Sequence, residues 1–181
     1  MSELDELKLA RVVDACGGID GRVKMQKIVY LLKAMGYDLP YYDFRIRQHG
    51  PFSRAVACDA DTLRGAEILV EQDEECGHTA EGEPMMLYSY RVRDSVVPLV
   101  RKHFDVASPH GAPSLEEICQ ELKGNDRAVL EVAATKVFLE REESLQGDAL
   151  DTELEHLKGH LSDRFDDADN LLRGLTERGL F

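Results

Sequence analysis

The spacing of apolar residues changes from a helical period to a strand period and back, and this change constrains the fold most strongly. In residues 3–16 and 22–35, apolar side chains recur at i, i+3, i+4 and i+7, which places them on one face of a helix. Residues 54–64 have similar inward spacing. Residues 68–70 and 86–92 have strand character on either side of a polar stretch. Three helices followed by a hairpin with a polar tip predict a winged helix.

The link between the second and third helices is longer than in most winged helices. Residues 41–47 alternate partly between apolar and polar side chains, so we expect a strand there. Gly50-Pro51 should end this strand. A further helix is expected over 94–104, with Pro98 kinking it or delaying its start.

The second part of the chain has only helical patterns. Ser114 and Glu117 have the spacing of a capping box, and Asn125 or Asp126 can cap the next helix. We therefore predict a mostly helical α+β protein. Its parts are a winged-helix-like lobe with a β-hairpin wing (1–105), a linker (106–113) and a small all-helical lobe packed on the first (114–181).

A basic segment stands out against an acidic background. Residues 22–54 carry seven basic and two acidic side chains, whereas the whole chain has a net charge of −13. Such a cluster predicts a surface for an anionic partner, or for an acidic part of the same chain. The acidic second part, with 17 acidic and 8 basic residues over 106–181, should repel nucleic acid.

Other features narrow the class of protein. The four cysteines are too far apart for a zinc knuckle or a redox pair. No apolar run has the roughly 20 residues that span a bilayer, and the acidic start lacks the layout of a secretory signal. We expect a cytoplasmic protein that does not contact the membrane, holds no metal and needs no cofactor.

Three short motifs together resemble the YwgA-like family of uncharacterised bacterial and archaeal proteins, and more distantly the Panacea domain of SocA-type antitoxins. The first motif covers Gly21 to Leu32, the second is His49-Gly50-Pro51-Phe52-Ser53, and the third is Leu130 to Thr135, with Leu157-Lys158 further on. This chain departs from the family in having Met25 for leucine, and His49 and Phe52 for two tyrosines.

The resemblance implies a winged-helix-like protein that binds a toxin or regulates genes. It brings no catalytic residue that could be transferred to this chain. No acid–base or nucleophile constellation is visible either, since His49 and Ser53 have no orienting acid or Gly-x-Ser-x-Gly elbow. We therefore expect a protein that is not an enzyme, and keep an enzyme acting on a small anion as a third class.

The second motif and its neighbours form the candidate site. In one interpretation, Pro51 stiffens the chain, Ser53 caps the following helix, and that helix end binds one phosphate or carboxylate with Arg54. In the other, Gly50 and Pro51 are only punctuation between two elements. The motif-loop residues are Gln26, His49, Gly50, Pro51 and Ser53.

The basic residues also have two interpretations. Lys24, Lys27 and Lys33 lie off the apolar stripe of their helix and should be solvated. Alternatively, Arg22 and Lys27 pair with the acidic second lobe, and Gln26 is either solvated or linked to the His49 loop. The candidate DNA- or anion-binding residues are Arg22, Lys24, Lys27, Arg45, Arg47, Arg54 and Arg64.

The leading hypothesis is a cytoplasmic regulator of transcription that binds DNA through these residues. The alternative is an antitoxin-like or adaptor protein that binds an acidic or basic protein such as a toxin, and the charge of −13 favours masking of a basic one. A homodimer stays open in both cases.

Overall fold

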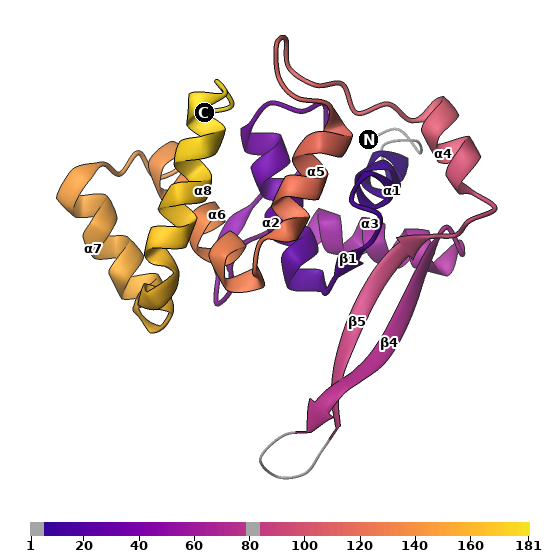
Figure 1. The fold of residues 1–181 in the computed structure, drawn as a ribbon, viewed down its shortest axis with the longest axis horizontal. Helices are drawn as coiled ribbons and strands as arrows, with labels where there is room; N and C mark the ends of the chain where they lie inside the picture. The colour runs from indigo at the N-terminus through magenta and orange to yellow at the C-terminus, as the bar shows by residue number, and fades with distance from the viewer. Residues whose placement is uncertain (1–5, 79–83) are drawn as a thin grey trace.

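The computed structural model describes residues 6–78 and 84–181, which form a mostly helical α+β fold (Figure 1). The elements are α1 (Glu6–Ala15), β1 (Ile19–Asp20), α2 (Arg22–Ala34), β2 (Arg45–Arg47), β3 (Gly50–Phe52), α3 (Arg54–Gly65), β4 (Leu69–His78), β5 (Pro84–Val92), α4 (Val97–His103), α5 (Leu115–Gly124), α6 (Arg127–Arg141), α7 (Gly147–Lys158), the 3₁₀ helix η1 (Gly159–Arg164) and α8 (Phe165–Glu177).

Strands β4 and β5 form a long antiparallel hairpin that extends beyond the helices (Figure 1). The sheet order is β1-β5-β4, with Ile19 opposite Tyr90. Strand β4 extends into the polar stretch that was expected between the two strands, since it continues to His78 through a bulge between Glu75 and Gly77. The sequence did not predict strand β1, because two residues are too few to show the alternation that marks a strand.

A second, smaller hairpin lies between α2 and α3. The strand expected over 41–47 is confirmed only for Arg45–Arg47. Gly50-Pro51 does not end the extended structure but begins β3, with Ile46 opposite Pro51. The positive φ of Gly50, +80°, turns the chain back on itself in a conformation that glycine adopts without strain.

Helices from both predicted lobes contribute to the described hydrophobic cluster. Helix α6 packs against α2 and β3, and α5 packs against α1. Buried residues such as Ile28 and Leu31 of α2 and Leu130 and Ala134 of α6 supply apolar side chains to this cluster. The cluster positions the Gly50-Pro51 hairpin between α2 and α6.

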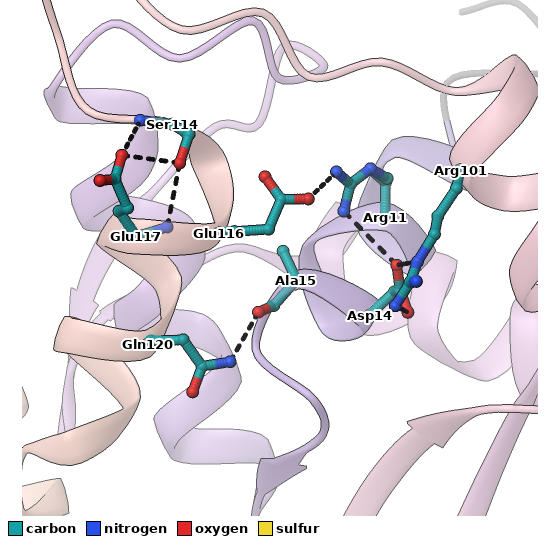
Figure 2. Close-up of polar contacts among 8 residues, drawn as sticks. All are labelled: Arg11, Asp14, Ala15, Arg101, Ser114, Glu116, Glu117 and Gln120. Atoms are coloured by element: carbon teal, nitrogen blue, oxygen red, sulfur yellow. Dashed lines mark hydrogen bonds and ion pairs between the residues drawn. The ribbon is translucent and has the colours of Figure 1, made fainter.

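Helix starts follow the expected signals in several places. Ser114 and Glu117 form the predicted capping box, which lowers the pKa of Glu117 because the Ser114 hydroxyl and N–H donate to its carboxylate (Figure 2). Asp126 caps α6 by accepting from the Ala128 N–H at 2.7 Å. Helix α4 starts late, at Val97, with Pro98 in its first turn.

Polar contacts also hold α5 and α4 against α1 (Figure 2). Arg11 pairs with Glu116, and Arg101 donates to both oxygens of the nearly buried Asp14 at 2.8 and 3.0 Å. Gln120 donates to a carbonyl at the end of α1 at 2.9 Å. These contacts join segments that are about a hundred residues apart in the chain.

In residues 6–78 and 84–181, we find no helix with the length and apolarity needed to cross a bilayer.

Candidate functional site

Strand β3 places the Gly50-Pro51 motif in the interior, between α2 and α6. A Cβ on Gly50 would lie 2.5 Å from Thr135 Oγ1 and 3.5 Å from Lys27 Cε. The first distance is too short for any real contact, so α6 approaches this backbone as closely as only glycine allows. The Gly50-Pro51 motif therefore packs distant segments of the chain together and does more than separate two elements.

Gln26 and Ser53 form a two-way hydrogen bond. The Gln26 amide donates to the Ser53 carbonyl at 3.0 Å and accepts from the Ser53 N–H at 2.9 Å, and both residues are buried. Of the two interpretations of Gln26, this confirms the link to the His49 loop and excludes a solvated side chain. The predicted Ser53 cap is wrong: the hydroxyl is buried and has no hydrogen-bond partner among the described residues.

Lys27 is buried, with only 1% of its surface exposed, so the expectation that it is solvated is wrong. Its ammonium donates to the Pro51 carbonyl at 2.6 Å. Burial lowers the pKa of Lys27 to about 8, and nearby Lys158 adds to this effect while Glu131 opposes it. The apolar stripe of α2 gave the wrong expectation for Lys27 because α6 and β3 cover a second face of this helix.

Glu131 and Lys158 complete this buried centre. Their side chains pair at 2.6 Å, and the Lys158 ammonium also donates to the Gln48 carbonyl at 2.7 Å. His49, half exposed, places Nδ1 3.5 Å from the other Glu131 oxygen. Sequence reasoning did not assign Glu131 or Lys158 to the site, although both occur in the third resembling motif.

The centre formed by Lys27, Glu131 and Lys158 suits a structural role. Each ammonium already donates to a backbone carbonyl of the hairpin segment, and the Glu131 carboxylate is paired with Lys158. The three side chains are almost fully enclosed, so they offer no open position to a substrate. Within the described part of the chain, no group of three or more His, Cys, Asp or Glu residues could hold a metal ion.

Arg22 and Arg64 belong to a second polar cluster at the base of the long hairpin. Both donate to Asp61, at 3.2 and 3.3 Å, and Arg64 also donates to Glu71 at 2.5 Å. The Arg22 Nε donates to the Tyr90 hydroxyl at 2.7 Å, and this hydroxyl donates to Glu71 at 2.5 Å.

This cluster corrects the pairing expected for Arg22. The carboxylate partners of Arg22 lie in the first lobe, whereas one of the two interpretations had the second lobe supplying them. The hydrogen bonds from Tyr90 and Arg64 lower the pKa of Glu71. Two guanidinium groups thus face two carboxylates, and the cluster has no net charge.

The remaining candidate cations are dispersed. Lys24 is half buried and donates to the Lys123 carbonyl at 2.6 Å, and Lys33 donates to the Tyr42 carbonyl, so neither is simply solvated. Arg45 pairs with the neighbouring Asp43 at 3.2 Å. Arg47 and Arg54 are exposed. The structure therefore does not bring the seven basic residues together on one outward patch.

A cleft of about 930 Å³ lies beside the long hairpin. It is lined by β5, with exposed Leu87 and Tyr88, and by the start of α6 at Asp126–Ala128. The first turn of α2 also lines the cleft. Leu87 and Tyr88 are 41% and 47% exposed. Apolar side chains exposed beside a cleft are typical of a surface for a partner molecule.

No protein-family model and no curated protein matches this chain.

Proposed function

We propose that this protein is a non-enzymatic cytoplasmic regulator that acts by binding another protein through the β4–β5 hairpin and the cleft beside it. The element order is helix, strand, helix, the β2–β3 hairpin, helix, strand, strand, and the β1-β5-β4 sheet excludes the β2–β3 hairpin. Apart from the inserted β2–β3 hairpin, this is the order of a winged helix, in which the β4–β5 hairpin is the wing. The wing of a winged helix can contact nucleic acid or protein. The charge of the hairpin therefore distinguishes between these two kinds of partner.

The charge of the hairpin carries the proposal. Residues 69–92 contain six acidic residues and one basic residue, a net charge of −5 with histidine neutral. A hairpin of this charge repels phosphate groups and attracts a basic protein surface. Leu87 and Tyr88 add exposed apolar area of the kind that aromatic-rich interfaces bury. A basic toxin-like protein fits this surface.

DNA binding is the second candidate function, and one observation favours it. Arg54 is exposed at the start of α3, the helix that a DNA-binding winged helix inserts into the major groove, and exposed Arg47 lies in the neighbouring hairpin. Against it, Arg22 and Arg64 are already paired with Asp61 and Glu71. We therefore rank protein binding first.

The test compares two matched double variants of the full chain. Leu87→Ser with Tyr88→Ser removes the apolar pair beside the cleft. Leu99→Ser with Tyr41→Ser removes side chains of the same types that are more exposed, 53% and 82%, from α4 and from the segment before β2.

Each protein is used to capture partners from a lysate of its native host and is titrated with random duplex DNA at low salt. We expect one stoichiometric protein partner with wild type and the control variant, its loss from the hairpin variant, and no shift of DNA. Retention of the partner by the hairpin variant, or a salt-sensitive DNA shift without a protein partner, contradicts the proposal.

A further inference from the structure

Among residues 6–78 and 84–181, no strand pairs with one edge of β5 along most of the long hairpin. Strand β1 covers β5 only opposite Ser89 and Tyr90, and the Gly21 N–H then donates to the Tyr88 carbonyl at 2.6 Å. Towards the tip, the described residues place no further strand on this side of β5. The uncovered edge borders the cleft, since Leu87 and Tyr88 line it.

The backbone groups on this edge can be assigned from the pairing. In an antiparallel strand, alternate residues direct both their N–H and C=O groups to the same side. The Tyr88 carbonyl points to β1. The backbone N–H and C=O of Met86, which is two residues earlier in the chain, therefore point to the same side. The hairpin bulge begins only beyond the pair of Met86 with Glu75, so this alternation holds at Met86.

We propose that this free edge of β5 binds an extended, lysine- or arginine-rich segment of the partner protein as an added antiparallel strand. The inference rests on the proposed function and names how the partner is held. Strand addition gives affinity through main-chain hydrogen bonds and leaves selectivity to the flanking side chains.

The outer edge of β4 is a weaker candidate. Its sequence places Glu71, Asp73, Glu74 and Glu75 within five residues, and closely spaced charges on an edge are a common protection against strand addition. Over the same length of β5, Leu87, Tyr88 and Ser89 are uncharged. A second copy of this chain is also disfavoured, because two hairpins of charge −5 repel each other.

The side chains around the β5 edge suit a basic segment. Asp20 lies opposite Ser89, on the face that Leu87 shares, and Asp73 lies directly opposite Tyr88. Each face of the edge therefore offers one exposed apolar side chain and one exposed carboxylate. A lysine or arginine can pack its stem on the first and place its charge near the second, and arginine can also stack on Tyr88.

The cations that line the cleft do not outweigh these carboxylates. Arg22 and Arg64 are neutralised within their cluster, and the Lys24 ammonium donates to the carbonyl end of α5. Arg127 is adjacent to Asp126 in the chain, and both residues line the cleft.

The experiment uses the full chain and two end-blocked, fluorescein-labelled heptapeptides. One alternates lysine with valine, and the other alternates glutamate with valine. Affinity is measured by fluorescence anisotropy at low and high salt, and amide hydrogen exchange is followed at Met86 with and without each peptide. Met86→Pro removes the N–H that points to the free edge but leaves the pairing with β4, and Met86→Ala keeps it.

We expect the lysine peptide to bind at least tenfold more tightly than the glutamate peptide and to slow exchange of the Met86 amide at least tenfold. Met86→Pro should weaken binding at least tenfold, and Met86→Ala less than twofold. Equal affinity for the two peptides overturns the inference, as does binding without protection of Met86 in wild type. Amide exchange at Met86 in the wild-type protein tests strand addition even if the Met86→Pro variant fails to fold.

Failure of the strand-addition inference can be distinguished from failure of the proposed protein binding. If the host partner is captured and lost with the Leu87 and Tyr88 variant while the peptide result is negative, strand addition is wrong and protein binding stands. If no partner is captured at all, the proposed function is wrong.

Discussion

The Lys158 ammonium lies 2.6 Å from a Glu131 carboxylate oxygen, and both side chains are buried. Lys27 is buried close to this pair and also donates to the Gly50-Pro51 segment. The centre therefore contains two cations and one anion. Its net charge of +1 makes the protein sensitive to which of the three side chains is removed.

Removal of the Glu131 charge should lower the free energy of unfolding far more than removal of the Lys27 charge. Glu131→Gln leaves two ammonium groups enclosed without a counter-ion, and we expect a loss of about 3–5 kcal/mol in the free energy of unfolding. Lys27→Met leaves a neutral Glu131–Lys158 pair and should cost less than about 1.5 kcal/mol. Urea unfolding of the two variants measures the difference, and equal losses would show that the centre has no excess charge.

The stability contribution of Lys27 should depend on pH. Its pKa is about 8 when folded and near the ordinary 10.5 when unfolded, so the unfolded chain binds more protons between these values. Stability conferred by Lys27 is therefore lowest below pH 8 and rises up to pH 10.5.

The check is the difference in unfolding free energy between wild type and Lys27→Met. Raising the pH from 7 to 9.5 should move it by about 2 kcal/mol in favour of wild type, at about 1.4 kcal/mol per pH unit above pH 8. A difference that stays constant with pH would mean that Lys27 keeps its ordinary pKa in the folded protein.

Gly50 should be intolerant of a side chain for two separable reasons. Gly50→Ala combines a positive φ of +80° with a clash against Thr135 Oγ1. Gly111→Ala is the matched control, because its φ is +78° and no atom lies within 4 Å of the added Cβ. We expect the control to lose about 1 kcal/mol and Gly50→Ala at least about 2 kcal/mol more.

A double-variant cycle then isolates the clash. In a Thr135→Ala background the hydroxyl is absent, so Gly50→Ala should cost less than it does in wild type. If its cost is the same in both backgrounds, the close approach of α6 does not explain the requirement for glycine.

Gln26 should fix the end of the small hairpin through its two bonds to Ser53. Gln26→Leu removes the Gln26 partner of the buried Ser53 N–H and leaves the Ser53 carbonyl only its bond from the Ala57 N–H at 3.3 Å. We expect a loss of about 1–3 kcal/mol with faster exchange of the Ser53 amide. Gln120→Leu removes one bond at an exposed site and should cost less than about 1 kcal/mol. Unchanged exchange at Ser53 in Gln26→Leu would contradict this role.

Much of the secondary structure follows from local signals in the sequence. The apolar stripes located α1, α2 and α3 to within a few residues, and the capping box at Ser114 and the Asp126 cap form as expected. These features depend on residues within one or two turns of each other. The mostly helical α+β class follows from the same periods.

The composition of the candidate site could not be predicted in the same way. Burial of Lys27 depends on α6, which lies about a hundred residues further along the chain, and Lys158 comes from yet another helix. The Ser53 hydroxyl caps nothing in α3 among the described residues, and the link to the Ser53 backbone comes from Gln26, which is 27 residues earlier in the chain. Long-range packing decides these positions, and periodicity describes only one helix at a time.

Photo-crosslinking in living cells tests protein binding most directly. The full chain would carry p-benzoylphenylalanine in place of Tyr88 or, as the control, in place of the highly exposed Tyr41. We predict one discrete protein adduct from position 88 that is absent from position 41. Adducts with nucleic acid at position 88, or the same adducts from both positions, would contradict the proposal that the hairpin binds a protein partner.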